Sequence, residues 1–376
     1  MRVHRKEQLA LSAHMSQLEN LLENSRFGIP VSEQLAMNAT LDLSASRVLC
    51  LTSGRGQTAI QLADRLKDAR VICHVLEAFA ASETAELIDE CDSNVLLDCS
   101  ADLPEEDFDL CVLPMSRSGE TGLTRDWLQQ AYDRLAMNGM LVVTIDQKKE
   151  TWFHHELEKF GKNLTRIPKR KGVVYKLKKL KTLKKLKDFS TEFAFRDQEQ
   201  LIKAVSRPGV FSHRRLDLGA RALMESMEIE AGDRVLDIGC GAGVVGLAAA
   251  KRAADVSVHF VDSNPRALEC ALAGAELNGI SDVDATLSHD GAIGSEEDDM
   301  RGQFDVVLGN PPYYSHFQIA EIFLQSGLKA LRPGGRIQIV TKNQEWLQAR
   351  MEQLFDEATT TECRGYSIVS AIQRGS

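Results

Sequence analysis

The chain has 376 residues, of which 43% are hydrophobic and 26% charged. This is a globular composition with enough length for two domains of common size. Its apolar stretches, such as residues 244–250 and 110–114, are far shorter than the roughly 20 residues of a membrane-spanning helix. The first residues have a basic start but neither an uninterrupted apolar core nor a small-residue cleavage site. We therefore expect a soluble protein without a secretory signal and with a cytosolic address.

Charge is distributed unevenly along the chain, whose net charge is −9. Residues 1–150 carry 14 basic and 24 acidic side chains, residues 151–190 carry 13 and 3, and residues 191–376 carry 18 and 27. Within the basic block, residues 176–187 hold seven lysines, and leucine recurs every third residue. This period suggests a basic amphipathic helix or a 3₁₀-like turn docked by its leucines, or else a solvated linker. The more specific interpretation of this basic block is that it binds a polyanionic partner.

The cysteines are at positions 50, 73, 91, 99, 111, 240, 270 and 363. They form no CxxC pair and have no neighbouring histidine cluster at zinc spacing, so we predict free, mostly buried thiols and no metal site.

Strands alternate with helical segments, which predicts an α/β fold with a mainly parallel sheet. The pattern occurs twice, in the same order. In the first half the landmarks are residues 47–56, 74–77, 100–102, 108–113 and 171–172, which align with 234–243, 259–262, 288–290, 304–309 and 364–365 at offsets between 185 and 196. In the second half, we predict strands at 234–239, 256–262, 304–310, 336–340 and 366–373, with helices at 246–252, 265–278, 319–331 and 345–355.

The two copies differ where chemistry would take place. The second copy has glycines at 239, 241 and 243, where the first has Thr52, Gly54 and Gly56. Asp237 is replaced by Cys50, and residues 310–313 (Asn-Pro-Pro-Tyr) correspond to 114–117 (Pro-Met-Ser-Arg). The N-terminal copy is therefore predicted to be a degenerate duplicate that keeps the fold and has lost the site.

A strand followed by a glycine turn and a helix surrounds a ligand with backbone N–H groups and a helix N-terminus. Residues 241–246 even fit the GxGxxG of dinucleotide-binding enzymes, with Asp262 placed to hold a ribose diol. However, the carboxylate of Asp237 would repel a pyrophosphate and suits a cationic sulfonium or ammonium. Together with the Asn-Pro-Pro-Tyr tetrapeptide, it favours S-adenosylmethionine over a dinucleotide.

The tetrapeptide follows an apolar strand, so Asn310 faces the same crevice as the glycine turn. An exocyclic amine or amide is a poor nucleophile because its lone pair is delocalised. The Asn310 side-chain oxygen and the Pro311 carbonyl can each accept one of its protons and turn the lone pair toward a methyl group. Pro311 and Pro312 fix the backbone, and Tyr313 offers a flat face to a planar base.

Residues 236–243 (Leu-Asp-Ile-Gly-Cys-Gly-Ala-Gly) resemble the first motif of class I methyltransferases. This resemblance implies that Gly239, Gly241 and Gly243 contact the cofactor, with Asp237 beside it. It also implies that Asp262 holds the ribose hydroxyls and that Asp290 lies near the adenine amino group.

Asn-Pro-Pro-Tyr resembles the motif of adenine-N6 DNA, release-factor glutamine and ribosomal RNA guanine-N2 methyltransferases. A degenerate copy before an active one, with residues 208–219 ahead of the glycine motif, resembles the RsmC/RlmG family of bacterial ribosomal RNA guanine-N2 methyltransferases. The resemblance implies two tandem doubly wound Rossmann-like methyltransferase domains, the N-terminal one degenerate. It also places Phe211 and Ser212 near the ligand and the target base.

We predict three parts: a degenerate methyltransferase-like domain at 1–175, a basic linker at 176–195 and a catalytic domain at 196–376. Phosphate contacts with ribosomal RNA are expected from basic residues of the linker and of the segment before the glycine turn, namely Lys184, Lys185, Lys187, Arg207, Arg214 and Arg215. We expect a monomer. Two alternatives stay open: methylation of another planar nitrogen (protein glutamine or adenine N6), and a non-enzymatic RNA-binding assembly factor.

Overall fold

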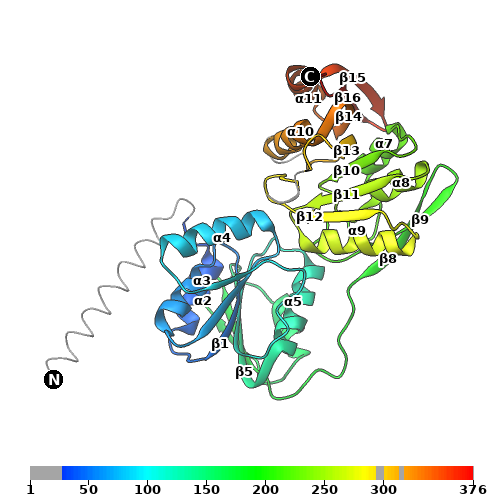
Figure 1. Cartoon of the computed structure of the whole chain (residues 1–376). Coiled ribbons are helices and arrows are strands. Elements are labelled where there is room, and N and C mark those ends of the chain that lie inside the picture. The colour runs from blue at the N-terminus through cyan, green and yellow to red at the C-terminus, as the bar shows by residue number, and fades with distance from the viewer. Residues whose placement is uncertain (1–27, 294–299, 313–316, 376) are drawn as a thin grey trace, which may run out of the picture. The chain divides into compact units, whose positions relative to one another are not determined.

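The structure is a computed structural model of the whole chain, and it describes residues 28–293, 300–312 and 317–375. The described part of the chain divides into two compact units (Figure 1), the first formed by residues 28–76 and 80–188, the second by residues 77–79 and the described residues from 189 onward. No helix in the described ranges is long and apolar enough to cross a membrane. All eight cysteines are free thiols, as predicted.

The first unit is built on a seven-stranded sheet of order β3-β2-β1-β4-β5-β7-β6, in which only β7 runs antiparallel to its neighbours. Its strands are β1 (Arg47–Leu51), β2 (Arg70–His74), β3 (Leu96–Asp98), β4 (Phe108–Met115), β5 (Leu135–Ile145), β6 (Thr165–Pro168) and β7 (Val173–Lys178). Its helices are α2 (Val31–Thr40), α3 (Gln57–Arg65), α4 (Ala78–Glu90), α5 (Thr121–Arg134) and α6 (Trp152–Glu158).

The second unit repeats this sheet in the order β12-β11-β10-β13-β14-β16-β15, again with one antiparallel strand, β16, next to the last. Its strands are β10 (Arg234–Ile238), β11 (Ser257–Asp262), β12 (Val283–Leu287), β13 (Phe304–Gly309), β14 (Leu331–Thr341), β15 (Asp356–Cys363) and β16 (Tyr366–Ile372). Its helices are α7 (Leu218–Ser226), α8 (Val244–Arg252), α9 (Pro265–Leu277), α10 (Gln318–Ala330) and α11 (Gln344–Leu354), and a hairpin of β8 (Thr191–Asp197) and β9 (Gln200–Ser206) precedes them.

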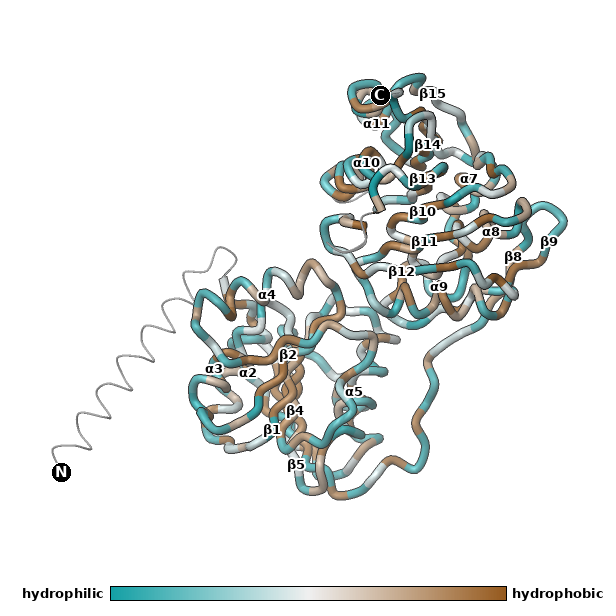
Figure 2. The backbone as a smooth tube through the Cα atoms, viewed as in Figure 1, coloured by the Kyte–Doolittle hydropathy of each residue, from teal (hydrophilic) through white to brown (hydrophobic). Residues whose placement is uncertain are grey.

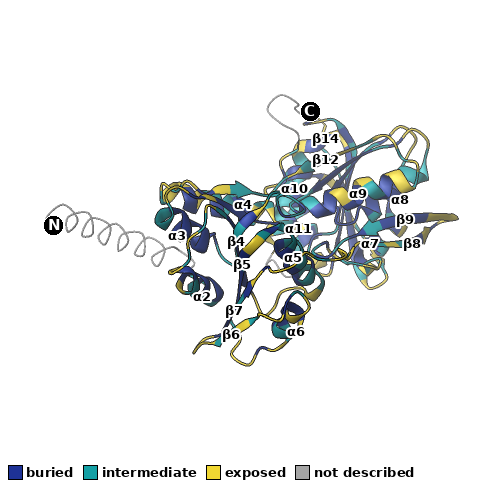
Figure 3. Ribbon diagram, turned by 90° about the horizontal axis from the view of Figure 1, so that it is seen from below, coloured by how far each residue is buried: buried dark blue, intermediate teal, exposed yellow. Residues whose placement is uncertain are grey.

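Each sheet is covered on both faces, because successive side chains of a strand point to opposite sides. In β10, Val235 packs into the core under α7, α8 and α9, whereas Leu236 and Ile238 pack into the core under α10 and α11. The inner strands are accordingly apolar along their length (Figure 2) and buried (Figure 3). The α/β class and the doubly wound sheets predicted from the sequence are confirmed.

The duplication extends to details that the alignment of landmarks could not show. The pairing of β4 with β5 and the pairing of β13 with β14 contain a register shift at the same place. It lies between Phe108 and Leu110 in β4 and between Phe304 and Val306 in β13. The aspartate of the shared Phe-Asp pair has the same task in each copy. Asp109 accepts hydrogen bonds from the backbone N–H groups of Ser46 and Arg47, and Asp305 accepts one from the N–H of Arg234.

Several elements differ from the sequence prediction. The helix predicted at 319–331 ends at Ala330, and residues 331–335 already belong to β14 through the register shift. The edge strand β15, the hairpin β8–β9 and helix α7 were not predicted. β15 reads Asp-Glu-Ala-Thr-Thr-Thr-Glu-Cys, and a largely exposed, polar edge strand lacks the apolar signal on which the prediction depends.

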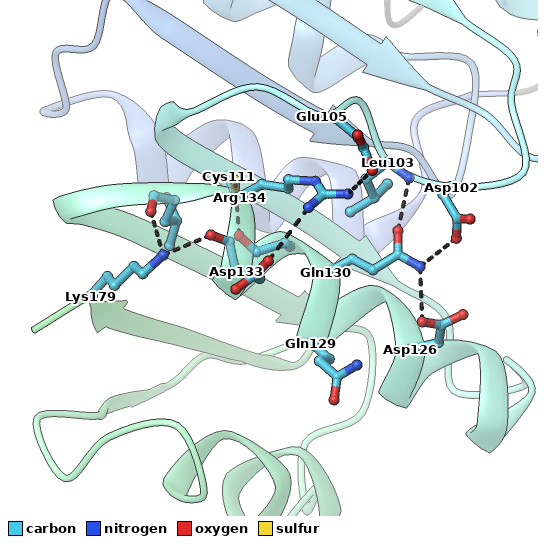
Figure 4. A network of polar contacts seen from close by, with 12 residues as sticks. Asp102, Leu103, Glu105, Cys111, Asp126, Gln129, Gln130, Asp133, Arg134 and Lys179 are labelled. Atoms are coloured by element: carbon cyan, nitrogen blue, oxygen red, sulfur yellow. Dashed lines mark hydrogen bonds and ion pairs between the residues drawn. The ribbon is translucent and has the colours of Figure 1, made fainter. Parts of the chain in front are cut away.

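The basic segment does not form the docked helix or 3₁₀-like turn suggested by its leucine period. Residues 173–178 complete β7, and residues 179–190 follow without helix. Strand alternation buries Leu177 and turns Lys179 inward, while Leu180 and Leu186 are about half exposed. The Lys179 ammonium donates to the carbonyl oxygens of Asp133 and Leu135 at 2.7 Å each, at the end of α5 (Figure 4). One lysine of the series thus stabilises a helix C-terminus.

The glycine turn of the first unit is closed by a buried carboxylate. Glu33, in the first turn of α2, accepts hydrogen bonds from the Thr52 hydroxyl (2.6 Å), the Ser53 N–H (3.0 Å) and both the N–H and the hydroxyl of Thr58. Burial raises the pKa of Glu33 above its usual value, and these donors oppose the rise. At the offset of 187 that aligns the two glycine turns, the equivalent of Glu33 is Ala220. In the first unit the Glu33 side chain therefore fills the place beside the glycine turn that stays open in the second unit.

Replacing Glu33 by Ala should destabilise the first unit by about 2–4 kcal/mol, because the buried donors of Thr58 and the half-buried donors of Thr52 and Ser53 would lose their acceptor. Hydrogen exchange of the amides in β1 and β4 measures this loss, and the amides in β10 and β13 serve as the internal reference. The exposed Glu90→Ala in α4 is the matched control. Equal protection of β1 in both variants would contradict the role assigned to Glu33.

Candidate functional site

The candidate site lies at the carboxyl ends of the inner strands of the second unit. The chain leaves β10 toward β11 on one side and later enters β13 on the other, so a crevice opens between β10 and β13. Asp237 and the glycine turn follow β10, Asp262 ends β11, and Asn310 follows β13. The pocket here is lined by Asp237, the turn at 239–242 and Asn310, together with Phe211, Ser212, Arg215 and Asp217 of the preceding loop.

The glycine turn has a conformation that side chains would disturb. Gly239, Gly241 and Gly243 all have positive φ angles, of 66°, 53° and 72°. A Cβ on Gly239 would lie 2.4 Å from the Phe323 ring, and one on Gly243 would lie 2.7 Å from the Cβ of Ala271. A Cβ on Gly241 would have its nearest neighbours in Phe211, at the ordinary contact distance of 3.8–3.9 Å. The outer two glycines therefore allow close packing, and the middle one leaves backbone open to the pocket.

Asp237 ties the end of β10 to the start of α8. Its Oδ2 accepts a hydrogen bond of 2.8 Å from the N–H of Gly246 in the first turn of the helix, and the side chain is 3% exposed. Burial raises the pKa of Asp237 to about 7, the Gly246 bond opposes the rise, and the charge of Asp262 adds to it. Near neutral pH this carboxylate would gain from a cation in the pocket that it lines.

Asp262 braces the turn from the neighbouring strand. Its Oδ2 accepts from the N–H of Gly241 at 2.8 Å and its Oδ1 from the N–H of Asn264 at 2.9 Å. Burial raises its pKa to about 6, and these backbone bonds oppose the rise. Of the predicted cofactor residues, Asp290 stands apart. It is exposed after β12 and accepts from the Ala292 N–H and the Ser288 hydroxyl, which holds its pKa below the usual value.

The loop before α7 lies over the glycine turn and is anchored from below. Phe211 lines the pocket with its ring 58% exposed. The fully buried Arg266 donates from Nη1 to the Pro208 carbonyl at 2.9 Å, and Asn264 donates from Nδ2 to the Gly209 carbonyl at 2.8 Å. The sequence analysis did not single out Arg266 or Asn264. For Arg266, the sequence showed only a charged residue in the first turn of a helix. Such residues are usually exposed, so nothing indicated a buried anchor.

Asn310 is held by an acid that the sequence analysis also missed. Its Nδ2 donates to Asp217 Oδ2 at 3.0 Å, and the same oxygen accepts from the Ala220 N–H at 3.1 Å as the N-cap of α7. The amide nitrogen therefore faces Asp217, so that the amide oxygen is the atom that can be presented to a substrate. Pro311 is buried, and Tyr313 lies outside the described residues.

The predicted basic residues fall into two groups. Lys184, Lys185 and Lys187 are exposed in the first unit. In the second unit Arg214 and Arg215 are exposed and Arg215 lines the pocket, whereas the Arg207 guanidinium pairs with Glu269 at 2.8 Å. Glu269 therefore offsets much of the charge of Arg207. Within the described ranges, no group of three or more His, Cys, Asp or Glu side chains could hold a metal ion.

Comparison with known proteins agrees with this geometry. Residues 202–370 match the methyltransferase small domain family. The uncharacterized protein YbxB of Bacillus subtilis is 31% identical over 186 residues, which are 48% of this chain and 90% of that protein. The ribosomal RNA small subunit methyltransferase C of Serratia proteamaculans is 31% identical over 162 residues, 41% of this chain and 45% of that protein.

The chain thus spans less than half the length of that methyltransferase in sequence, but the structural likeness extends further. The T. thermophilus 16S rRNA N2 G1207 methyltransferase (RsmC), solved in complex with AdoMet and guanosine, is 22% identical and superposes with a TM-score of 0.74 over 92% of both chains. This likeness confirms the two-unit fold. On the match over 202–370 and on its similarity to nearly all of YbxB, the chain belongs to the methyltransferase small domain family, and it is similar in sequence to part of ribosomal RNA small subunit methyltransferase C.

Proposed function

We propose that the protein transfers a methyl group from S-adenosylmethionine to the exocyclic N2 of a guanine in ribosomal RNA. The observation that carries the proposal is the placement of Asn310. Its amide is oriented by Asp217 at the edge of the pocket that the glycine turn forms. The relatives support the acceptor, since they include ribosomal RNA methyltransferases and a structure whose ligands are AdoMet and guanosine.

The residues of the pocket fit S-adenosylmethionine, which when bound supplies an electrophilic methyl group on a sulfonium. Asp237 is a buried carboxylate whose raised pKa would return toward its usual value beside a cation. Asp262, at the end of β11, would accept hydrogen bonds from the ribose hydroxyls, and Phe211, in the loop before α7, would cover the ligand. A Cβ on Gly241 would stand between the backbone and such a ligand. Asp290 would reach the adenine only if its loop turned inward.

Asn310 and Pro311 act on the amine that receives the methyl group. The Asn310 Oδ1 and the Pro311 carbonyl accept the two N–H groups of the guanine amine, which directs its lone pair at the methyl carbon. Asp217 acts through Asn310 as a positioning residue, because an amide whose nitrogen is held by a carboxylate cannot flip. Asn310 is neutral, so these contacts add no charge beside the sulfonium. The amine becomes acidic only once the new bond has begun to form, so its surplus proton can pass to water and no strong base is needed.

The substrate must present its guanine outside a stacked helix, because N2 cannot reach the pocket from within paired RNA. Extruding a base costs about a few kcal/mol, least where the base is already unpaired. Exposed Lys184, Lys185 and Lys187 would contribute phosphate contacts. Arg214 and Arg215 would do so at the rim of the pocket, and Arg207 would need to exchange Glu269 for a phosphate. With such a substrate, we expect the protein to act in the cytoplasm and as a monomer.

The alternatives differ in what they would leave intact. An enzyme for protein glutamine or adenine N6 would bind the same cofactor and leave ribosomal RNA guanine unmodified. A non-enzymatic assembly factor would bind RNA without methyl transfer. The second copy has Asp237, Gly239 and Asn310 where the first has Cys50, Thr52 and Pro114, and this difference favours an enzyme.

Wild-type protein given labelled S-adenosylmethionine and total ribosomal RNA should produce labelled N2-methylguanosine on nucleoside analysis. Asn310→Ala should lower kcat by about 10²–10³-fold, the usual cost of removing one oriented polar group, and leave cofactor affinity nearly unchanged. Asp217→Ser keeps a favoured N-cap residue, so it should lower kcat clearly and Tm only slightly. Label in protein alone would favour the glutamine alternative, and normal methylation by Asn310→Ala would overturn the mechanism.

Affinity for S-adenosylmethionine should rise with pH through about 7, because Asp237 attracts the cation only when ionised. Below that pH the protonated carboxyl gives no attraction, and above it the gain levels off. Calorimetry between about pH 5.5 and about pH 8.5 measures the profile. Asp237→Asn keeps an acceptor for Gly246 and should flatten it, leaving the smaller step of Asp262 near pH 6. S-adenosylhomocysteine, whose sulfur is neutral, should show a weaker dependence, and an identical one would contradict the sulfonium contact.

Changing Lys184, Lys185 and Lys187 to Gln should weaken RNA binding and reduce the slope of log K against log salt by about 2, as three phosphate contacts predict. The control replaces Lys67, Lys148 and Lys149, three exposed lysines of the same unit, with the same change of net charge. Filter binding at several salt concentrations distinguishes them. Equal slopes for the two triple variants would show that the first three lysines belong to a solvated connection only.

A further inference from the structure

The loop over the glycine turn contains a histidine that connects two polar side chains. His213 Nε2 accepts a hydrogen bond of 2.9 Å from the Nε of Arg214, and its Nδ1 lies 2.9 Å from the hydroxyl oxygen of Ser206. A neutral imidazole has one donor nitrogen and one acceptor nitrogen, so Nδ1 carries the proton and donates to Ser206. His213 is therefore neutral in this arrangement. Its ring is fixed by Ser206, which is fully buried at the end of β9.

The backbone around His213 has an uncommon conformation. Ser212 and Arg214, on either side of it, have φ angles of 59° and 72°. Residues with side chains rarely adopt such angles, and those that do cluster at functional sites. The turn is also closed twice, because the Ser212 carbonyl accepts from the Arg215 N–H at 3.3 Å and the Ser212 hydroxyl donates to the Arg215 carbonyl at 3.1 Å. Arg214 thus extends from a rigid turn.

Arg207 and Arg214, in the same loop, are held in two different ways. The Arg207 guanidinium pairs with the Glu269 carboxylate at 2.8 Å, which offsets its positive charge. Arg214 is held by a neutral ring, and among the described residues it has no carboxylate partner. A neutral acceptor orients a guanidinium and leaves its full charge for an external anion. Since His213 engages Nε, the two Nη groups remain for that anion, and such a pair matches two oxygens of a phosphate.

The place of Arg214 indicates which phosphate it meets. It is exposed, and the next residue, Arg215, lines the pocket that also contains Asn310. A guanine that reaches Asn310 brings its sugar and phosphate to the rim of this pocket. The phosphate must stay at the rim, because the carboxylate of Asp237 lines the interior. An oriented guanidinium with an uncompensated charge at this rim therefore fits a phosphodiester of the strand that carries the guanine.

We propose that His213 is a positioning residue for RNA. It holds Arg214 so that the Nη groups bind a phosphate of the nucleotide whose guanine enters the pocket. This inference rests on the proposed function and adds to it one specific RNA contact and the residue that orients it. The contact is the same before and during methyl transfer, so it contributes to KM for RNA and leaves kcat unchanged.

Two substitutions of His213 separate the bond to Arg214 from the bond to Ser206. Gln reaches about as far as Nε2 and keeps an acceptor for Arg214, whereas Asn keeps a donor at the place of Nδ1 for Ser206 and loses the acceptor. With full-length protein, labelled S-adenosylmethionine and ribosomal RNA fragments that wild type methylates, His213→Asn should raise KM for RNA about 3–10-fold, the effect of one net hydrogen bond. Its kcat and cofactor affinity should be those of wild type.

His213→Gln should restore KM to near the wild-type value, because the Arg214 Nε again has an acceptor. The matched control is His155→Asn, which changes an exposed histidine of the first unit in the same way and should leave KM unaltered.

A double-mutant cycle tests whether His213 acts through Arg214. Arg214→Ala should raise KM for RNA and reduce the slope of log K against log salt by about 0.7, the value for one phosphate contact on a single strand. His213→Asn alone should leave this slope nearly unchanged, because the charge of Arg214 is retained. In the Arg214→Ala background, His213→Asn should have no further effect on KM. Filter binding at several salt concentrations gives the slopes.

The outcomes separate this inference from the proposed function. If wild type forms N2-methylguanosine and His213→Asn has an unchanged KM, the inference is overturned and the proposed function stands. A His213→Gln variant as impaired as His213→Asn, or an additive effect in the Arg214→Ala background, would indicate that the imidazole only supports the loop and would also overturn it. If no methyl group is transferred to RNA, the proposed function fails. The difference between the Asn and Gln variants in filter binding then decides the role of His213 by itself.

Discussion

The second unit depends on the bond between the buried carboxylate of Asp237 and the N–H of Gly246. It joins the end of β10 to the start of α8, so the turn between them must be tight, and its glycines must take positive φ angles. The loop over the turn, the brace from Asp262 and the approach of Phe323 all follow from that geometry. The cost is a carboxylate held away from water with a pKa near 7. Such an arrangement is costly in a purely structural turn and useful where a cation is to be bound.

The first unit shows what the same fold does without this carboxylate. Cys50 stands in place of Asp237, and the acid comes from the opposite direction, from Glu33 on α2. Its oxygens take up the backbone and hydroxyl donors that would otherwise face a ligand. The equivalent position in the second unit, Ala220, is a small residue that lines the pocket. A single position, occupied by glutamate in one copy and alanine in the other, accounts for much of the difference between a filled and an open crevice.

The fold could be predicted from the sequence because the buried parallel strands leave apolar runs that end in glycine or acid, and because the order of those runs repeats. The site could be predicted where it follows those strands, as at Asp237 and Asn310. Asp217, Arg266 and Glu33 were beyond reach, since each acts through a partner that is distant along the chain, 93 residues away in the pair of Asp217 and Asn310. Likewise, the leucine period at 177–186 was misread, because β-strand pairing with β5, invisible in a local window, determined the conformation of its first residues.

The charges around the site would keep apart the two ligands of the proposed function, a cation and a polyanion. Asp217, Asp237 and Asp262 gather at the crevice. Asp237 is buried and the other two are half-buried, and all three favour a cation and repel phosphate. Arg215 stands at the rim and Arg214 next to it, both exposed. A strand of RNA at this edge would be attracted at the rim and repelled within, so that its phosphates would stay outside and only an uncharged base would enter. Under that field a neutral asparagine is better suited than a carboxylate to receive the base, because it accepts hydrogen bonds without adding to the repulsion of the backbone that delivers it.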